Sequence, residues 1–139
     1  MQEYRYLLDT NILSVLVRFP AGIVAARLAA AGESLVCTSI VVACELRFGA
    51  EKKGSSLLSA RIGQLLNFLP VLALSEEADR HYAEIRYFLE RSGKVIGPND
   101  LLIAAHARSL GLVVVTDNER EFSRVPGLMV ENWLISPEE

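Results

Sequence analysis

Four acidic side chains occupy positions where a solvated surface does not usually place a carboxylate. Asp9 directly follows the apolar run at residues 6–8, and Asp117 comes shortly after a second apolar run at residues 112–115. In an open α/β sheet, ligands bind in the crevice at the carboxyl ends of the parallel strands. If both runs are strands of one parallel sheet, Asp9 and Asp117 face this crevice together.

Glu45 and Asp100 lie on the apolar sides of predicted helices. The helical neighbours of Glu45, three and four positions away, are apolar residues or glycine: Val41, Val42, Phe48 and Gly49. Asp100 stands in the first turn of its helix, and Ile103 and Ala104 follow one turn later on the same side. We therefore expect both carboxylates to be directed toward the core.

These four carboxylates need partners, because burying an unpaired carboxylate is strongly unfavourable. The cations available to them are few, since the only lysines are Lys52, Lys53 and Lys94 and the arginines fall mainly on outward helical positions. Several acids at one end of a sheet without matching cations favour a divalent ion with oxygen ligands, Mg²⁺ or Mn²⁺. A pair of such ions stabilises both the attacking and the leaving oxygen when a phosphodiester bond is cleaved.

Each acid, and the set as a whole, also fits a different role. Asp9, Asp100 and Asp117 taken singly fit helix caps or turns, and Glu45 fits a surface position if the helix phase differs. The set also allows an aspartyl-phosphate phosphotransfer domain, or a catalytically silent module for binding or dimerisation. Asn11 argues against phosphotransfer, because it stands where phosphatases carry a second aspartate.

An α/β fold with a mostly parallel sheet must position these acids, because short apolar runs alternate with longer segments of helical period. Strands are predicted at residues 6–8, 35–37, 71–74, 112–115 and 128–130. Helices are predicted at about residues 22–31, from 39 past 45, at 55–68, at 76–91 and at 100–109. Residues 51–56 are interpreted as a loop, and Asn118 with Glu121 resembles the capping box of a last short helix.

Length and charge narrow the function further. The 139 residues suit a single domain over residues 1–139. The formal net charge of −3 argues against a nucleic-acid binder that relies on bulk positive charge, but not against an enzyme that meets phosphates through a metal ion. The chain has no apolar run long enough to span a bilayer and no signal-peptide pattern at its start, so we expect a cytoplasmic protein without membrane contact.

The sequence resembles the PIN domains of VapC-type toxins, which are the ribonucleases of bacterial type II toxin–antitoxin pairs. The resemblance is carried by LLDTNILS (7–14), TSIVVACELRFGA (38–50), IGPNDLLIAAHA (96–107) and VTDNEREFSRVPGL (115–128). These blocks have the order and spacing of the family, and VENW (130–133) extends the similarity almost to the end of the chain. The resemblance implies a PIN-like three-layer fold, in which about five short strands, mostly parallel, are flanked by helices.

The resemblance also implies a Mg²⁺-dependent endoribonuclease, with Mn²⁺ as an alternative and one or two ions per site. Asp9 is then the central metal ligand, Asp100 the second, and Glu45 a ligand or the group that orients a metal-bound water. Family members often carry Asn-Asn where Asp117 and Asn118 stand, so either residue fills the fourth acidic place.

Polar and basic residues near the acids complete the expected site. Residues expected to hydrogen-bond ligands or waters are Thr10, Asn11, Ser39, Thr116 and Asn118. Candidates for contact with the RNA backbone are Arg47, Lys52, Lys53, Arg120 and Arg124.

The partners implied by the resemblance are an RNA substrate, such as tRNA or another structured RNA, and a VapB-type antitoxin that neutralises the toxin. A second copy of the chain in a homodimer is also expected. Operator DNA is expected to be reached only through the antitoxin.

Overall fold

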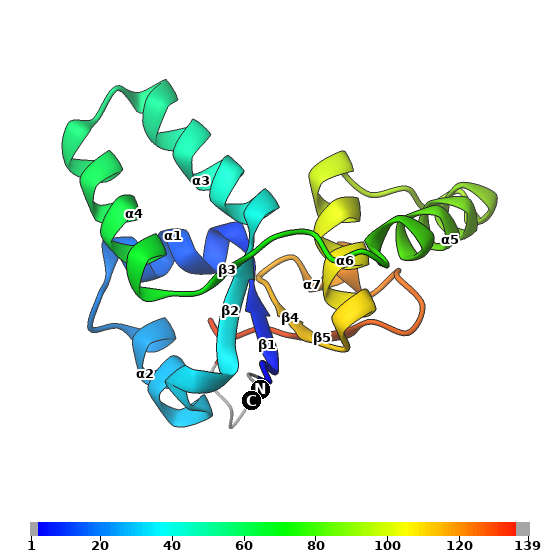
Figure 1. Cartoon of the computed structure of the whole chain (residues 1–139), viewed down its shortest axis with the longest axis horizontal. Helices are drawn as coiled ribbons and strands as arrows, with labels where there is room; N and C mark the ends of the chain where they lie inside the picture. The colour runs from blue at the N-terminus through cyan, green and yellow to red at the C-terminus, as the bar shows by residue number, and fades with distance from the viewer. Residues whose placement is uncertain (1–2, 136–139) are drawn as a thin grey trace.

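Five short parallel strands form a single sheet in the computed structural model, which describes residues 3–135 (Figure 1). The strands are β1 (Tyr6–Leu8), β2 (Val36–Ser39), β3 (Val71–Leu72), β4 (Val113–Val115) and β5 (Met129–Glu131). Their spatial order is β3-β2-β1-β4-β5, and every neighbouring pair is parallel. The predicted parallel sheet is confirmed, and β1 lies at its centre, with Leu7 paired to both Cys37 and Val114.

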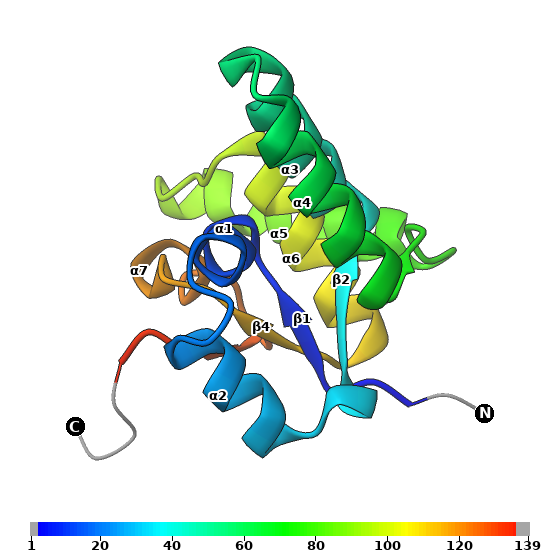
Figure 2. The same ribbon diagram turned by 90° about the vertical axis from the view of Figure 1, so that its left-hand side faces the viewer.

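Helices cover both faces of this sheet. They are α1 (Thr10–Arg18), α2 (Ile23–Ala31), α3 (Ile40–Lys53), α4 (Ser56–Phe68), α5 (Ala78–Ser92), α6 (Pro98–Leu110) and α7 (Glu119–Phe122), with a short 3-10 helix at Glu33–Leu35. Helices α1 and α2 lie on one side of the sheet, and α5 and α6 lie on the other (Figure 2). Helices α3 and α4 form a pair that extends past the sheet at the top left of Figure 1. The expected three-layer arrangement is therefore present.

Helix α1 is not among the helices expected from the sequence. Its β-branched residues Ile12, Val15 and Val17 have modest helix propensity, and the apolar run of β1 almost reaches it. Asp9 nevertheless begins the helix as its N-cap, and burial of Ile12 and Leu13 stabilises it. The sharp change from strand to helix at Asp9 places this carboxylate at the carboxyl edge of the sheet, the edge where β1, β2 and β4 end.

The arm made by α3 and α4 differs from the expected loop at residues 51–56. Helix α3 continues through Lys53, and Gly54 ends it in the left-handed conformation, with φ of 64°. The hydroxyl of Ser55 then accepts a hydrogen bond from the Leu58 N–H and begins α4. Only two residues therefore separate the helices, because glycine adopts this backbone conformation without steric strain.

Helix α6 crosses the core and carries Asp100 in its first turn. Buried residues occur nearly all round the helix: Leu101, Ile103, Ala104, Ala105, His106 and Ala107. The small alanine side chains allow close approach of neighbouring elements, and α6 packs against α5, α3 and β4. The site carboxylate of α6 is therefore held by a helix with little freedom to move.

No single helix among residues 3–135 is long and apolar enough to cross a membrane. Helices α1 and α2 meet such a test of length and composition only as a pair that is bent by 113°. Both helices contribute buried side chains to the core.

We predict that Ile103→Ala lowers the free energy of unfolding by about 2–5 kcal/mol, because the fully buried side chain leaves a cavity in the core. Leu57→Ala on α4 is the control, since Leu57 is 61% exposed and its truncation is expected to change stability by less than about 0.5 kcal/mol. Urea denaturation of the two variants and the wild type measures both effects. Equal stability of the two variants would contradict the assigned core.

Candidate active site

Asp9 is the most deeply buried carboxylate of the predicted set, with 5% of the residue exposed. Its Oδ1 accepts a hydrogen bond from the Thr10 N–H at 2.7 Å, and its Oδ2 accepts one from the Thr116 hydroxyl at 2.8 Å. Burial raises the pKa of Asp9; the two hydrogen bonds oppose the rise, and the nearby charges of Glu45 and Asp117 add to it. Neutral donors therefore hold Asp9 in place without cancelling its charge.

Glu45 is half-buried on α3 and connects two other elements of the site. The Thr10 hydroxyl donates to its Oε1, and the Asn99 side chain donates to its Oε2 at 3.1 Å. Of the neighbours that suggested an apolar side, Val41 and Val42 are buried, whereas Phe48 is 67% exposed. Glu45 thus stands at the border of the core and not within it.

Asp100 forms a carboxyl pair with Glu121, an acid of α7 that is not among the expected site residues. Burial, the hydrogen bond with Glu121 and the charges of Asp9 and Glu45 together raise the pKa of Asp100 to about 7. The backbone N–H of Gly97 donates to Glu121 Oε1 at 3.0 Å and is the main cause of a lowered pKa at Glu121. Of the two carboxyl groups, Asp100 therefore holds the proton and Glu121 is ionised when no cation is bound.

Asp117 is exposed and follows β4 at the same edge of the sheet. It accepts a hydrogen bond from the Asn11 side chain at 3.2 Å. Its negative charge contributes to the raised pKa of Asp9. The neighbouring Asn118 donates its backbone N–H to the Thr116 hydroxyl at 3.0 Å and its amide to Glu121 Oε2 at 3.3 Å.

Two sequence expectations are altered by these contacts. Asn118 makes no side-chain cap to α7, so the predicted capping box is wrong, and its partner Glu121 turns toward Asp100 instead. Ser39 does not hydrogen-bond a site acid; its hydroxyl accepts from the Val41 N–H and contacts His106 Nδ1 at 2.9 Å. The three-residue spacing from Asn118 to Glu121 is the signal available for Glu121, but it does not show which way the carboxylate points.

No cation forms an ion pair with these acids within residues 3–135. The ion pairs found there are Arg80–Glu77, Arg86–Glu90 and Arg108–Glu84, each with an arginine on α5 or α6. Asp9, Glu45, Asp117 and Glu121 are instead contacted by hydroxyls, amides and backbone N–H groups, and Asp100 is hydrogen-bonded to Glu121. The local charge is strongly negative and open to neutralisation by a cation from solution.

The donor set suits Mg²⁺ better than a metal that requires a complete protein cage. All the acidic donors are oxygens, and no three of the described His, Cys, Asp or Glu side chains converge into a ready ligand cluster. Mg²⁺ keeps several waters and is commonly held by only one or two carboxylates together with substrate phosphate oxygens. The buried Asp9 and the neighbouring Asp100 fit this requirement.

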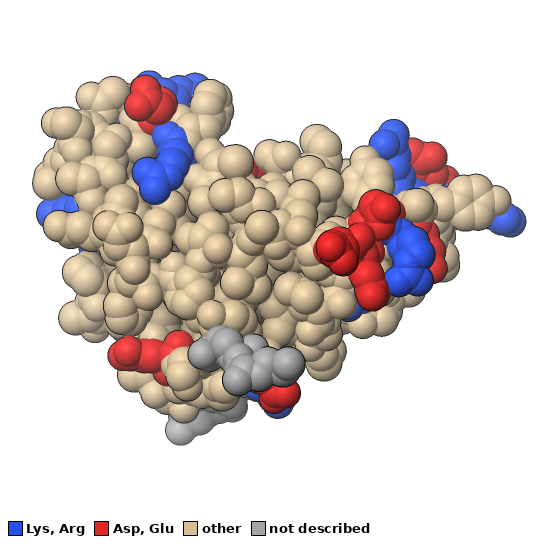
Figure 3. Space-filling view, viewed as in Figure 1, with Lys and Arg blue, Asp and Glu red and all other residues tan. Residues whose placement is uncertain are grey.

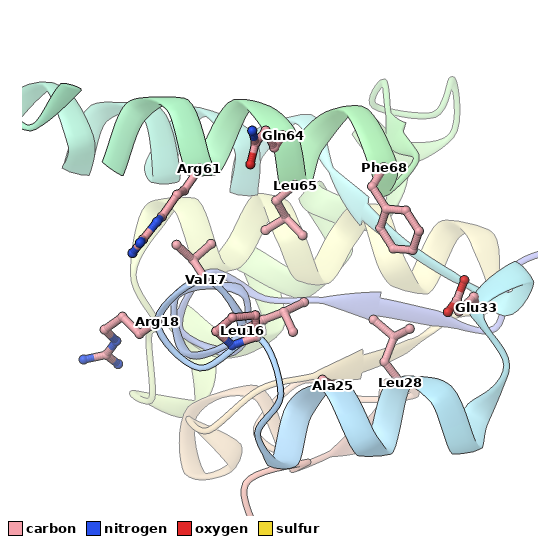
Figure 4. A pocket seen from close by; sticks show the side chains of 11 residues that line it. Leu16, Val17, Arg18, Ala25, Leu28, Glu33, Arg61, Gln64, Leu65 and Phe68 are labelled. Carbon is pink, nitrogen blue, oxygen red and sulfur yellow. The ribbon is translucent and has the colours of Figure 1, made fainter. Parts of the chain in front are cut away.

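Two hollows with Arg18 in both linings lie beside or near the acids. The surface is hollowed between the α3–α4 pair and the α5–α6 side (Figure 3). A cleft of about 340 Å³ is lined by Thr10 and Glu45 together with the cations Arg18 and Lys53. A groove of about 540 Å³ between α1, α2 and α4 shares Arg18 with this cleft (Figure 4).

The expected basic residues are divided between two places. Lys53 lines the cleft beside Glu45, whereas Arg47 and Lys52 are exposed elsewhere on α3. Arg120 and Arg124 lie at α7, on a separate cleft beside α5.

An all-parallel α/β domain with a cluster of unpaired carboxylates at the carboxyl edge of its sheet matches the PIN domain model over residues 6–128. Ribonuclease VapC2 of Haemophilus influenzae is 41% identical over 132 residues, which cover 94% of this chain and 98% of that protein. The tRNA(fMet)-specific endonuclease VapC of Shigella flexneri is 38% identical, with coverage of 93% and 98%. The chain belongs to the VapC ribonucleases of the PIN domain family.

Solved structures agree with this assignment. VapBC2 from Rickettsia felis, bound to a DNA fragment from its promoter, superposes with a TM-score of 0.86 at 33% identity and covers 92% of this chain and 98% of its own. DNA-bound VapBC from Salmonella typhimurium gives a TM-score of 0.81 at 37% identity, with coverage of 94% and 98%.

We predict that the metal-free protein loses stability as pH rises from about 5 to 8. The raised pKa of Asp100, about 7 against an ordinary value of 3.8, means that the folded state holds a proton which the unfolded state has released in this range. Asp9, whose pKa is also raised, acts in the same direction. Thermal unfolding in a chelator should show a falling midpoint, which added Mg²⁺ raises again near neutral pH.

The control for this pH dependence is Asp100→Asn, which should flatten it, whereas Asp79→Asn on the exposed side of α5 should leave it unchanged. A midpoint that rises through this range in the metal-free wild type would show that the acids are not buried together as described.

Proposed function

We propose that this chain is the toxin of a type II toxin–antitoxin pair and cleaves RNA phosphodiester bonds with Mg²⁺, or alternatively Mn²⁺, at the carboxylate cluster. The observation that carries the proposal is the buried Asp9, which is held only by neutral donors and lies near the charges of Glu45, Asp117 and Asp100. Such a cluster is unfavourable unless a cation neutralises it. One or two divalent ions held by these carboxylates would neutralise them and would supply a Lewis acid for a phosphate oxygen.

The residues have distinct roles in this proposal. Asp9 and Asp100 are the metal ligands, and Glu45 is a third ligand or orients the attacking water. Asp117 or Asn118 fills the fourth place beside the substrate.

The neutral donors position the acids and exclude alternative orientations. Thr10 contacts both Asp9 and Glu45, because its backbone N–H donates to the first and its hydroxyl to the second. Thr116 fixes the other oxygen of Asp9, and Asn11 fixes Asp117. In this proposal these contacts position the carboxylates for a metal ion without neutralising their charge.

Glu121 has a role in the same proposal as the positioning residue for Asp100. Glu121 receives the Gly97 N–H and contacts the Asp100 carboxyl across the start of α6. A bound cation would favour the ionised form of Asp100, and the contact with Glu121 would help to hold its carboxylate in place.

The substrate is proposed to be a structured RNA such as tRNA, in the cytoplasm, in keeping with the relative named as a tRNA(fMet)-specific endonuclease. The proposed partner is a VapB-type antitoxin, in keeping with the solved VapBC relatives. The homodimer and the indirect contact with operator DNA stay predictions.

The groove between α1, α2 and α4 is the proposed docking surface for the antitoxin. Leu16, Leu28, Leu65 and Phe68 give it an apolar lining, and Arg18 and Arg61 supply positive charge (Figure 4). Because Arg18 also lines the cleft beside Glu45, a segment seated in this groove can continue toward the acids and block them.

Asp9→Asn is expected to lower kcat/KM for RNA cleavage at least about 100-fold, because the buried metal ligand loses its charge. A chelator should abolish the activity of the wild type, and Mg²⁺ should restore it. Asp79→Asn is the matched control on an exposed acid and should keep wild-type activity. An Asp9→Asn variant that cleaves RNA normally refutes the site, and stable labelling of Asp9 by an acyl-phosphate mimic would favour phosphotransfer instead.

Phe68→Glu is expected to escape neutralisation, because it places a charge in the apolar groove. Phe48→Glu is the control, since Phe48 is similarly exposed, at 67% against 59%, but lies outside the groove. Each variant is co-expressed with a VapB-type antitoxin that restores growth to cells making the wild type. Growth restored equally in both cases would place the antitoxin elsewhere.

A further inference from the structure

A second cleft, of about 490 Å³, lies between the end of α5 and α7 and is lined by cations in an otherwise acidic protein. Lys94, Arg120 and Arg124 line it together with Phe88, and no acidic side chain contributes to the lining. The chain as a whole carries a net charge of −3. A concentration of positive charge here therefore requires an explanation of its own.

These cations are not paired with carboxylates inside the part of the chain that the structure describes, residues 3–135. By contrast, two arginines of α5 form ion pairs: Arg80 with Glu77, and Arg86 with Glu90. Arg124 instead donates to the backbone carbonyl of Val95 at 3.0 Å, which fixes its guanidinium at the cleft, and it forms no ion pair with a carboxylate among these residues.

The basic cleft adjoins the acidic site through a shared wall. The loop from Lys94 to Gly97 leads from α5 into α6. Two side chains, one on α7 and one just after it, contact this loop. Arg124 binds the carbonyl of Val95 on one side, and Glu121 accepts the Gly97 N–H on the other. Arg124 is also close enough for its charge to lower the pKa of Glu121, the carboxyl partner of Asp100.

Phe88 gives the cleft a second kind of recognition. Phe88 is 47% exposed. Its backbone carbonyl accepts a hydrogen bond from the Ser92 hydroxyl at 2.9 Å. An exposed aromatic ring beside unpaired cations is the combination that binds single-stranded nucleic acid, since bases stack on the ring and phosphates contact the cations.

We propose that this cleft binds a nucleotide of the RNA that flanks the scissile phosphate, with its phosphate at Lys94, Arg120 and Arg124 and its base on Phe88. The inference rests on the proposed ribonuclease function and adds a substrate subsite to it. The acidic site gains its attraction for phosphate only when a divalent ion is bound, whereas this cleft is positive without one. An adjoining site of fixed positive charge thus holds the strand while the acids act on the next phosphate.

The test compares RNA binding by the double variant Lys94→Gln/Arg120→Gln with that of Arg80→Gln/Arg86→Gln, which removes the same charge from the neighbouring surface. Both are made together with Asp9→Asn, so that a fluorescein-labelled single-stranded oligoribonucleotide is not cut. Fluorescence anisotropy in Mg²⁺ at several salt concentrations gives the Kd and its salt dependence. Phe88→Ala is measured in the same way.

The cleft double variant is expected to bind about 10-fold more weakly at low salt, with the slope of log K against log salt smaller by up to about 0.7, because one neutralised phosphate on a single strand contributes about 0.7. Phe88→Ala should weaken binding about 5-fold or more without changing the slope, because stacking involves no counterion release. The surface double variant should retain the wild-type slope. In the cleaving background, the cleft variant should raise KM and leave kcat unchanged.

Equal behaviour of the cleft and surface double variants overturns the proposal, as does a cleft variant that keeps its RNA affinity and loses only affinity for poly-glutamate, which would mark a protein-binding site. Failure of the proposed function is separate and visible, since it appears as absence of Mg²⁺-dependent cleavage by the wild type. The binding measurements do not depend on cleavage, so the two failures cannot be confused.

Discussion

Mutual repulsion among carboxylates at one edge of the sheet is the constraint around which the rest of this structure is arranged. Asp9, Glu45, Asp100, Asp117 and Glu121 come from separate segments; the charges of Glu45 and Asp117 raise the pKa of Asp9, and those of Asp9, Glu121 and Glu45 raise the pKa of Asp100. Within residues 3–135 hydroxyls, amides and backbone N–H groups hold Asp9, Glu45, Asp117 and Glu121, Asp100 is hydrogen-bonded to Glu121, and none of the five forms an ion pair with arginine or lysine. The fold supplies the energy to hold them together, because β1 and α6 are anchored in a closely packed core.

This constraint explains why hydrogen-bond donors near the site are neutral. A lysine or arginine beside Asp9 would stabilise the folded protein but would also compete with a metal ion for the same oxygens. Thr10 and Thr116 orient Asp9 without neutralising it, and Asn99 does the same for Glu45. Asp100 has no cation to offset its burial, and burial together with the hydrogen bond to Glu121 and the nearby acidic charges raises its pKa to about 7.

Segregation of charge follows from the same arrangement. The acids gather where β1 and β4 end, while the unpaired cations of α7 and the α5–α6 loop lie across a single loop from them. A net charge of −3 hides both features, because it averages a strongly negative edge with a positive cleft. Only the loop that joins α5 to α6 separates the two features, with Glu121 on one side of it and Arg124 on the other.

Local sequence patterns are enough to predict the sheet, the four segments that carry the expected acids, and the family. Strand ends and helix phase are local properties, so Asp9, Asp117 and Asp100 can be assigned to one edge from apolar runs and spacing. Helix α1 is not predicted from local patterns, because its β-branched residues have modest helix propensity. Burial of Ile12 and Leu13 in the core stabilises the helix.

Which side chains meet one another is settled by the packing of distant elements. The Asn118–Glu121 spacing is equally consistent with a local cap and with a carboxylate turned toward another helix, and only the packing of α7 against the loop at Gly97 selects the second. Phe48 and Glu45 share one predicted side of α3, yet the first is exposed because no element covers that part of the arm. Local spacing sets the direction of a side chain along its own element, whereas its partners depend on where distant elements pack, which no local pattern records.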